Sequence, residues 1–469
     1  MAGNKHIKPG PSLEPFASPD HLDLELQSFL EDASSRLCDW FGKASQNGPL
    51  PALSVMPGVA PALDGLTRKA LLDDLQLIMD GAFQPSHPGS LAHLDPPPLT
   101  ASIVADLICA GLNNNLLAEE LSPSLSRLER MLCQWFTKRL GMPPQSGGVA
   151  ASGGSLSNLM ALVVARQYLG LQNEPKAVVL ASEDAHVCLA KAVRVMGLDE
   201  DALQKVGTNN EGQISIELLQ SHLNRLRSEG RKCFVLVATA GTTVRGAIDP
   251  LVELGRFCAR EDLWFHVDGA IGGIFALSKQ TNSIVNGISS ADSVTINPQK
   301  LLGITKASSL LLVANRLNLI QTFSTGLPYI EPAWGEDAHG GEMGIQGTRP
   351  AEVLKLWLGL RQLGEKGIER LLKDSIDRRR SFQKQLDVSK LSVITGPLHL
   401  ISCTPKSFNQ NQSARWSKET RRSLLDEKFM LSRPFHNDRY YLKAVMGNPH
   451  TQLTHLSKLA NLLNHSVGI

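Results

Sequence analysis

The sequence predicts an α/β protein with a mostly parallel sheet covered by helices on both faces. Short apolar runs typical of strands alternate with helical patterns between about residues 99 and 315: KAVVLAS, KCFVLVATA, LWFHVD, DSVTI and SSLLLVA. Strands separated by helices pair in parallel, because each helix carries the chain back to the same edge of the sheet. The chain has 469 residues, too many for one simple core, so two or three lobes are expected.

Residues 1–90 are predicted to be an N-terminal arm followed by amphipathic helices. The arm is polar and rich in proline and glycine, and Ser18-Pro19 carries the residue types of a helix start. An apolar stripe with helical spacing follows, and a second amphipathic helix is expected at about residues 67–79. Such stripes must dock on the protein's own core or on a partner subunit.

The proline-rich segment HPGSLAHLDPPPL (87–99) marks a boundary within the chain. After it we predict a large domain at residues 91–345 and a smaller C-terminal α+β domain at residues 346–469. A glycine-rich segment lies between the two, and a helix is expected from about Pro350.

Composition excludes several classes of partner. Apolar residues make up 42% of the chain and charged residues 20%, which is ordinary for a globular protein. The 47 basic and 45 acidic residues give a net charge of +2, so neither nucleic acid nor a membrane surface is expected as a partner. The dense basic run Arg378-Arg379-Arg380 is interpreted as a solvated helix face.

Cysteine usage and the first residues favour a cytoplasmic protein. The seven cysteines are scattered and form no C-x-x-C pair, a pattern typical of reduced thiols and not of a disulfide framework or a zinc site. The start of the chain lacks the apolar core of a signal peptide, and no uncharged apolar stretch is long enough to span a bilayer. We therefore expect a soluble protein of the cytoplasm.

Three small residues open a long helical pattern in ASGGSLSNLMALVVAR (151–166). Gly153 and Gly154 allow a tight turn, and Ser155 begins the helix, whose N–H groups and dipole attract an anion. The alternative is an ordinary glycine-containing helix start, because Gly-Gly-Ser is not a Walker loop. The segment is a candidate phosphate cradle.

His186, Asp268 and Lys300 each follow an apolar strand pattern. Parallel sheets collect ligand contacts at the carboxyl ends of their strands, so these three side chains are candidates for one site. The His186 ring could stack on a planar ligand or be a hydrogen-bonded structural group. Apolar surroundings destabilise the charged form of a lysine and make its amine nucleophilic. The alternative for Lys300 is a buried stem with its head in solvent.

Asp268 lies in FHVDGAIGG (265–273), where the alternation of side chains along a strand puts His266 on the same side. An ionised carboxylate at the end of an apolar strand needs a positive partner to offset its desolvation. Gly269 and Ala270 leave room for a flat body against the backbone. A His-x-Asp metal pair is conceivable, but the sequence suggests no third ligand nearby, so no metal is predicted.

These parts together describe a site for pyridoxal phosphate. The anion cradle suits the phosphate, the stacking ring suits the pyridine ring, the carboxylate suits the ring nitrogen and the nucleophilic amine suits the aldehyde. The ordered set is far more specific than any one member.

The sequence resembles the group II pyridoxal-phosphate-dependent amino acid decarboxylases, which include glutamate, aromatic amino acid, cysteine sulfinate and diaminobutyrate decarboxylases. The likeness runs from about His87 to the C-terminus. The blocks that carry it are HPGSLAHLDPPPL, LNNNLLAEELSPSLSRLE, SGGSLSNL, ATAGTTVRGAIDP, HVDGAIGG, DSVTINPQK and GNPHT. Their order and spacing make a chance similarity improbable.

The resemblance implies the aspartate-aminotransferase-like fold, called fold type I, and a homodimer with its active sites at the subunit interface. The N-terminal helices would then wrap the partner. It also implies a role for each matching residue. Lys300 would bind the cofactor as a Schiff base, Asp268 would pair with the ring nitrogen, and Ala270 and His186 would lie on the two ring faces. The phosphate would be held by Gly154, Ser155, Asn297 and Gln299. Thr242 would lie near the cofactor's carboxylate-facing edge, and Gly347 and Thr348 would reach the phosphate in the partner subunit.

Three positions depart from the family pattern. Gln299 stands where the family has histidine, so it can hydrogen-bond a phosphate but cannot shuttle a proton. Ala338 stands where several members have a tyrosine proton donor; His339 or Tyr329 could substitute, and we favour His339 as the catalytic group. Lys443 replaces an arginine that holds the substrate carboxylate in many relatives, and it offers a point charge instead of a bidentate fork.

We therefore expect a lyase that acts on a small-molecule amino acid, removes the α-carboxylate of the L-form and releases CO2 and an amine. The late-chain pattern leans towards bacterial diaminobutyrate- or aspartate-type members. A decarboxylating aldehyde synthase, a transaminase or an aldehyde lyase would share Lys300 and Asp268, so these activities stay open. A catalytically idle homologue that binds the cofactor in a structural or regulatory role also stays open, because Gln299, Ala338 and Lys443 depart from the pattern.

Overall fold

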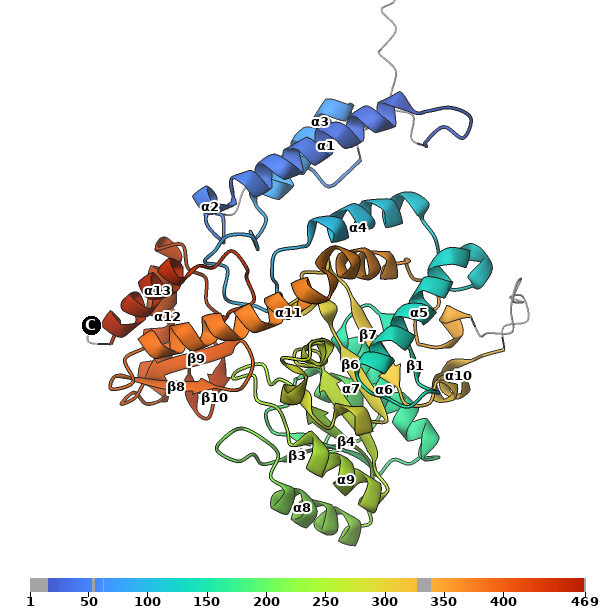
Figure 1. Cartoon of the computed structure of the whole chain (residues 1–469), viewed down its shortest axis with the longest axis vertical. Coiled ribbons are helices and arrows are strands. Elements are labelled where there is room, and N and C mark those ends of the chain that lie inside the picture. Colours follow the sequence, from blue (N-terminus) through green and yellow to red (C-terminus); the bar gives the residue numbers. More distant parts are fainter. Residues whose placement is uncertain (1–15, 53–54, 62, 327–338, 468–469) are drawn as a thin grey trace, which may run out of the picture.

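Seven strands form the central sheet of the computed structural model, which describes residues 16–52, 55–61, 63–326 and 339–467. In chain order they are β1 (Gly147–Ala151), β2 (Ala177–Ser182), β3 (Leu203–Val206), β4 (Lys232–Thr239), β5 (Trp264–Gly269), β6 (Ser293–Ile296) and β7 (Ser309–Val313). Across the sheet the order is β1-β7-β6-β5-β4-β2-β3, with β7 antiparallel to both neighbours and the other pairs parallel. The predicted α/β class with a mostly parallel sheet is confirmed (Figure 1).

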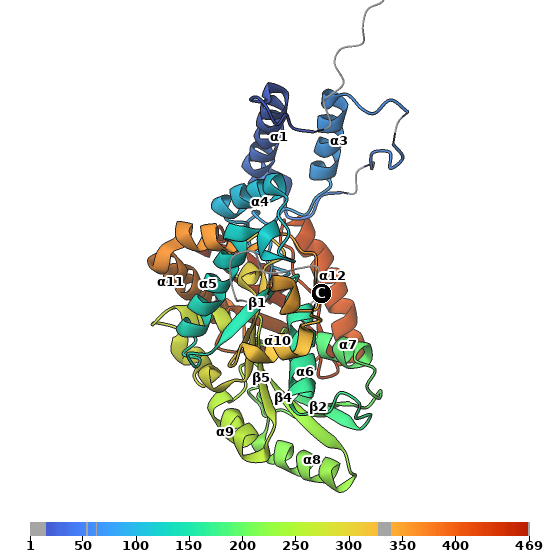
Figure 2. The ribbon, with the colours of Figure 1, turned by 90° about the vertical axis from the view of Figure 1, so that its right-hand side faces the viewer.

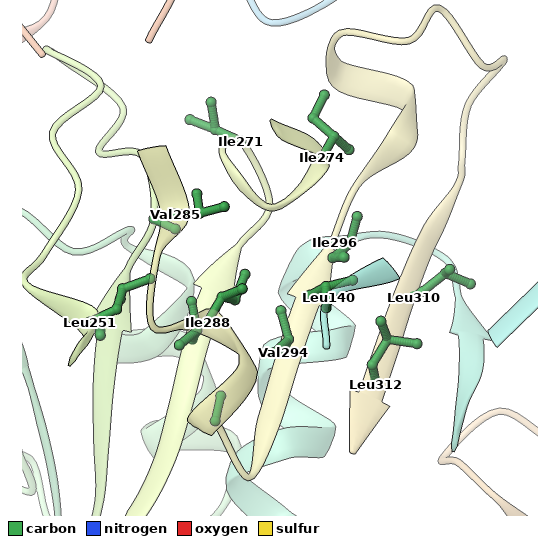
Figure 3. Close-up of a cluster of buried hydrophobic side chains, with 14 of the residues drawn as sticks. Leu140, Leu251, Ile271, Ile274, Val285, Ile288, Val294, Ile296, Leu310 and Leu312 are labelled. Carbon is green, nitrogen blue, oxygen red and sulfur yellow. The ribbon is translucent and has the colours of Figure 1, made fainter. Parts of the chain in front are cut away.

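The strands bury both faces because alternate side chains enter different cores. In β4, Leu236 belongs to one apolar cluster, whereas Val235 and Val237 belong to another on the opposite face. Val294 of β6 and Leu312 of β7 are register partners, and both point into the first cluster (Figure 3).

Helices cover both faces of this sheet. They are α5 (Pro123–Arg139), α6 (Gly154–Tyr168), α7 (Cys188–Val195), α8 (Ile216–Ser228), α9 (Leu251–Glu261) and α10 (Leu317–Phe323), whereas α4 (Thr100–Leu112) packs on α11 (Val353–Gln385). Short 3-10 helices are η1 (Glu119–Leu121), η2 (Gly273–Leu277), η3 (Asn282–Val285), η4 (Ile288–Ser290), η5 (Pro298–Lys300) and η6 (Gly340–Glu342). Phe136 of α5 and Phe257 of α9 enter the first cluster, and Met160 of α6 and Leu189 of α7 enter the second. Among the described residues, no helix combines the length and the apolarity needed to cross a membrane.

A smaller α+β part follows near the C-terminus. Its antiparallel sheet has the order β12-β9-β8, and its other elements are two helices and a short hairpin. Their bounds are β8 (Leu391–Thr395), β9 (Leu400–Pro405), α12 (Gln410–Asp426), β10 (Phe435–His436), β11 (Arg439–Tyr440), β12 (Leu442–Val445) and α13 (Leu453–His465). Trp416, Phe429 and Leu459 belong to its own core. The exact domain limits given above stay a prediction.

One long helix, α11 (Val353–Gln385), connects the two parts. Leu356, near its start, is buried in the first cluster of the large sheet, and Phe382, near its end, is buried in the core of the small sheet. Gly364 interrupts the helical backbone with φ 59° and ψ 176°, a conformation that side chains disfavour.

The basic run on α11 is not a solvated face as a whole. Arg378 Nε donates to the carbonyl oxygen of Met446 at 3.1 Å, and Arg379 Nε donates to that of Leu398 at 3.0 Å. The interpretation from sequence is therefore wrong for these two arginines, which fasten α11 to the small sheet.

The N-terminal helices α1 (Leu24–Gly42), α2 (Ala44–Asn47) and α3 (Arg68–Asp80) come before this body of the protomer, and α1 and α3 stand away from it (Figures 1 and 2). The helix start predicted at Ser18-Pro19 is wrong, because Asp23 caps α1 by accepting a hydrogen bond from Leu26 N at 2.9 Å. The helix predicted at about residues 67–79 is confirmed. α1 buries none of its side chains within the protomer.

Candidate active site

A cavity of about 430 Å³ opens at the carboxyl ends of the parallel strands, where α/β sheets bind ligands. The segments that follow β1, β2, β4, β5 and β6 supply its walls. The residues predicted from sequence that line it are Gly154, Ser155, His186, Thr242, Asp268, Ala270, Asn297, Gln299 and Lys300. The fold therefore gathers groups that are far apart in the sequence.

The anion cradle of this cavity is the start of α6. The helix begins at Gly154 directly after β1, so its first N–H groups lie at the cavity wall. Gly153 has φ 138°, which residues with a side chain rarely adopt. A Cβ atom on Gly154 would lie 2.7 Å from Asn297 Nδ2, closer than side chains approach. Glycine at 154 therefore lets Asn297 reach the helix start.

Two amide side chains present N–H groups at the same end. Asn297 Oδ1 accepts a hydrogen bond from the hydroxyl of Ser309 at 2.7 Å, which leaves its Nδ2 group beside Gly154. Gln299 Oε1 accepts from the backbone N–H of Ser308 at 2.5 Å, so its Nε2 group is the end that can donate to a ligand. Neutral donors thus build this end of the cavity.

Asp268 is a buried carboxylate, 5% exposed, that neutral donors hold in place. Its Oδ2 accepts from Asn158 Nδ2 at 2.8 Å, and its Oδ1 accepts from the backbone N–H of Ala270 at 3.1 Å. These donors carry no charge, so a cation in the cavity is needed to offset the desolvation of the carboxylate.

A chain of hydrogen bonds behind Asp268 fixes the Asn158 amide. Asn158 Oδ1 pairs with His266 Nε2 at 3.1 Å, and His266 Nδ1 pairs with Ser293 Oγ at 2.9 Å. Because Asn158 directs its N–H group to Asp268, its oxygen accepts from His266 Nε2–H, which defines the tautomer. Burial lowers the pKa of His266 to about 4, so the ring is neutral. His266 serves this chain, and among the described residues no cluster of His, Cys, Asp and Glu is arranged to hold a metal ion.

Lys300 lies on η5, immediately after β6, and lines the cavity. Burial lowers the pKa of its amine, and the charge of Asp268 offsets part of that effect, with smaller contributions from Cys188 and Asp95. A lowered pKa increases the fraction of neutral, nucleophilic amine.

His186 and Cys188 come from the turn between β2 and α7. His186 Nδ1 accepts from the backbone N–H of Cys188 at 3.2 Å, and burial lowers the pKa of the ring. The Cys188 sulfur accepts from Asn158 Nδ2 at 3.3 Å, and burial raises the pKa of the thiol. Burial therefore disfavours a charge on both side chains, and Asp268 and Lys300 are the other ionisable groups of the lining.

Lys443 lies on β12 of the small part, at the edge of the same site. Its Nζ donates to the backbone carbonyl of Thr243 at 3.1 Å, and Thr243 lines the cavity. Burial lowers the pKa of Lys443 to about 8, and the charge of Lys300 lowers it further in the same direction.

Three predicted residues are not brought to the cavity of their own protomer: His339, Gly347 and Thr348. His339 Nδ1 accepts from the backbone N–H of Glu119 at 3.1 Å, and Asn115 Nδ2 donates to Thr348 Oγ1 at 3.3 Å. They pack along the chain that leads into α5. Two other residues of the predicted loop, Tyr329 and Ala338, lie outside the described residues.

Sequence reasoning missed Asn158 and Cys188. Asn158 lies one helical turn after Gly154, so it was detectable as a polar side chain on the site-facing side of a mostly apolar helix. Cys188 had no distinguishing signal, because a cysteine at a helix start is common in buried structure.

The groups present fit pyridoxal phosphate. N–H donors at the start of α6 match a phosphate, the Asp268 carboxylate matches a protonated ring nitrogen, and the Lys300 amine matches an aldehyde. The cavity volume also falls in the usual range for small-molecule sites, roughly 300–1,000 Å³.

Comparisons with known proteins agree with this fit. The family model of the pyridoxal-dependent decarboxylase conserved domain matches residues 61–395. The L-2,4-diaminobutyrate decarboxylase of Rhizobium meliloti (strain 1021) is 30% identical over 352 residues, which cover 74% of this chain and 69% of that enzyme. The aromatic-L-amino-acid decarboxylase of Bacillus atrophaeus is 33% identical over 281 residues, 59% of this chain and 58% of that enzyme.

Solved structures share the fold. The crystal structure of Oryza sativa TDC with PLP and tryptamine superposes with a TM-score of 0.88 at 20% sequence identity, covering 96% of this chain and 99% of that chain. The chain therefore belongs to the pyridoxal-dependent decarboxylase family: it is an amino acid decarboxylase, a lyase whose cofactor is pyridoxal phosphate.

Proposed function

We propose that this decarboxylase releases the α-carboxylate of an L-amino acid as CO2 in the cavity around Lys300. The observation that carries the proposal is the meeting of a buried amine, Lys300, and a buried carboxylate, Asp268, beside an anion cradle. Pyridoxal phosphate, when bound, supplies an aldehyde that attaches the substrate and a ring that withdraws electrons. The residues of the chain hold the reactants and control the protons.

Asp268 and Lys300 take the two central roles in this proposal. Asp268 would accept the N–H of the ring nitrogen and keep it protonated, and Asn158 is a positioning residue that aims the carboxylate. Lys300 would supply the amine that holds the cofactor's aldehyde. His186 and Ala270 would lie against its ring.

The remaining cavity residues bind the phosphate and the substrate. Gly154, Ser155, Asn297 and Gln299 present N–H groups or a hydroxyl to the phosphate. Thr242 forms the wall near the cofactor's edge, where its hydroxyl already accepts from Ala247 N at 3.0 Å. Lys443 holds the substrate carboxylate as a point charge.

A homodimer is part of the proposal. The exposed apolar residues of α1, α3 and α4 support it, because a protomer in water rarely leaves such a stripe uncovered. They include Leu24, Leu26 and Leu30 of α1, Leu75 and Ile78 of α3, and Val104, Leu107 and Ile108 of α4. We propose that a second copy covers them.

The dimer also gives a place to the residues that do not reach their own cavity. Gly347 and Thr348 would contact the phosphate in the partner subunit, and His339 would donate a proton there. The support for this is that none of the three residues lines the cavity of its own protomer.

The proposed substrate class follows the relatives. The relatives from Rhizobium meliloti and Acinetobacter baumannii are L-2,4-diaminobutyrate decarboxylases, and they support L-2,4-diaminobutyrate as the kind of substrate that this chain takes. We also propose a cytoplasmic location, which the seven free cysteines support. Fractionation of the native host with an antibody tests the location.

The decisive experiment measures CO2 and amine from purified holoenzyme with glutamate, aspartate, diaminobutyrate, ornithine, tyrosine and cysteine sulfinate. We expect CO2 and amine in equal amounts from at least one substrate, and a visible absorption that borohydride removes. Ammonia and aldehyde without amine would instead indicate the aldehyde synthase alternative.

Lys300→Ala supplies the matched test of mechanism. Turnover should fall by about a thousandfold or more, because the residue acts at the reacting atoms. Lys373→Ala, which removes an exposed lysine on α11, is the control and should keep full activity. Full turnover in Lys300→Ala refutes the assignment of the site.

A further inference from the structure

Three side chains from distant segments meet next to the walls of the cavity: Asp184, Arg245 and His436. Asp184 lies in the turn after β2, two residues before His186, and Arg245 lies two residues after Thr243; His186 and Thr243 both line the cavity. His436 lies on β10 of the small part. The side chains of His436 and Asp184 are 8% and 14% exposed, and Arg245 is buried as well. The cluster therefore joins two turns of the large part to the small part.

Hydrogen bonding defines where the His436 ring carries its proton. Arg245 Nη2 lies 3.0 Å from His436 Nε2, and a guanidinium can only donate, so Nε2 is the acceptor. The proton is therefore on Nδ1, which lies 3.4 Å from Asp184 Oδ1. Burial lowers the pKa of His436, which disfavours a second ring proton. In this arrangement the ring faces Asp184 as a donor.

The Arg245 end of the cluster has other contacts. Arg245 Nη1 donates to the carbonyl of Asn210 at 3.0 Å, and the carbonyl of Arg245 accepts from Gly396 N at 2.6 Å. Two contacts besides the one to His436 therefore hold this residue, and it gives the ring a fixed partner.

The Asp184 end depends more on His436. The backbone N–H of Asp184 donates to Ser182 Oγ at 3.1 Å, a contact within the same turn. Among the described residues, His436 is the cationic or ring partner within ion-pair distance of the Asp184 carboxylate. The link from this carboxylate to the rest of the molecule therefore runs through the small part.

We propose that His436 is a positioning residue that holds, through Asp184, the turn that presents His186 to the cofactor ring. The inference rests on the proposed function, in which His186 lies against that ring. Only Ala185 separates Asp184 from His186, so a shift of the carboxylate also moves the ring of His186. The small part thus sets one wall of the cofactor site in addition to supplying Lys443.

The test uses two variants that each keep one half of the His436 contacts. Asparagine places an N–H group near the Nδ1 position and can still donate to Asp184, whereas glutamine places its amide near the Nε2 position and can still accept from Arg245. Equilibrium titration of each apoenzyme with pyridoxal phosphate gives the dissociation constant. Visible circular dichroism reports how the bound cofactor is oriented.

We expect His436→Gln to raise the dissociation constant about tenfold, as for loss of a hydrogen bond to a charged group, and to change the visible circular dichroism. His436→Asn should stay within about threefold of the wild type, because the contact to Asp184 is kept. Asp184→Ala should reproduce the loss seen in His436→Gln, and it tests the same link without changing the ring.

A double-mutant cycle with His186 separates positioning from general packing. In the His186→Ala background, His436→Gln should raise the dissociation constant by less than about twofold more, because the group that it positions is gone. His222→Gln is the matched control: Arg225 Nη2 lies 3.0 Å from His222 Nε2, but neither residue lines the cavity. This control should bind the cofactor as the wild type does. Thermal melting of each variant reports stability separately.

Each other outcome has a distinct meaning. Wild-type affinity in His436→Gln or in Asp184→Ala overturns the inference and leaves the proposed function standing. Equal losses in the glutamine and asparagine variants, or full additivity with His186→Ala, also overturn it, because they mark a structural role of the ring. Absence of CO2 from every amino acid, with the cofactor bound to the wild type, refutes the proposed function, whereas the affinities still decide the inference.

Discussion

The cavity around Lys300 and the cluster formed by His339, Gly347 and Thr348 differ in whether their polar atoms have hydrogen-bond partners. In the cavity, Asp268, Asn297 and Gln299 each accept hydrogen bonds from groups of the same protomer. In the cluster, His339 Nε2 is buried with no hydrogen-bond partner among the described residues. The three side chains of the first region are held by hydrogen bonds within one chain, whereas the second region has a ring nitrogen with no hydrogen-bond partner among the described residues. Under the proposed dimer, the second region is the one whose residues would serve the cavity of the other copy.

The largest expected effect comes from Asp268→Asn. Asparagine keeps the shape but loses the charge that holds a proton on the ring nitrogen, so kcat should fall by about a thousandfold or more. Stopped-flow assays and the absorption of the bound cofactor check this. Ser293→Ala, at the far end of the same hydrogen-bond chain, should lose much less. Equal losses would mean that the carboxylate acts through packing.

His339→Asn should lower kcat by about a hundredfold with little change in KM, the usual contribution of a positioned proton donor. Mixing this variant with Lys300→Ala sharpens the comparison. If the donor comes from the other subunit, each mixed dimer regains one intact site, about half of wild-type activity. Unchanged kcat in His339→Asn would remove this residue from the reaction.

Gly154→Ala should weaken cofactor binding by tens of times, because the new Cβ atom would lie 2.7 Å from Asn297 Nδ2 and push that amide out of the cradle. Equilibrium titration of the apoenzyme with pyridoxal phosphate gives the dissociation constant. Gly58→Ala is the control, because no atom lies within 4 Å of the Cβ position there. Equal affinities for Gly154→Ala and wild type would contradict the cradle.

The smallest expected effect is on the pH dependence of KM. The pKa of Lys443 is lowered to about 8, so its charge is present below that pH and is lost as the pH rises through it. KM should therefore rise about tenfold between pH 7 and pH 9, as expected for a group that must be protonated to bind a carboxylate. Lys443→Arg stays protonated and should flatten the profile. A wild-type profile already flat would exclude Lys443 from carboxylate binding.

The sequence was most informative where local rules suffice. Lys300, Asp268 and His186 could be placed together because each follows a strand of a parallel sheet, and such strands end at one edge. The helix start at Gly154 was readable from its glycines. These inferences need only the period of a strand and the chemistry of one residue.

The features that could not be predicted from the sequence are those that depend on contacts between distant segments. Nothing local shows that residues 91–99 run from the strand of Lys443 to the turn after Lys300, because that depends on two backbone hydrogen bonds, between Leu91 and Val445 and between Leu99 and Gly303. The sequence predicted a surface position for Arg379, because its hydrogen-bond partner, the carbonyl of Leu398, comes from the distant segment between β8 and β9. The start of α1 was misplaced because Asp23, and not Ser18, caps the helix.

The helix α11 has a consequence for how the protein unfolds. Leu356 and Phe382 anchor its two ends in different cores, so neither core can lose its packing without disturbing the same helix. Melting of the small sheet would expose the buried face of α11 and loosen the large sheet as well. The two parts should therefore behave as one cooperative unit, with a single calorimetric transition, and a chain cut within α11 would leave both cores incomplete.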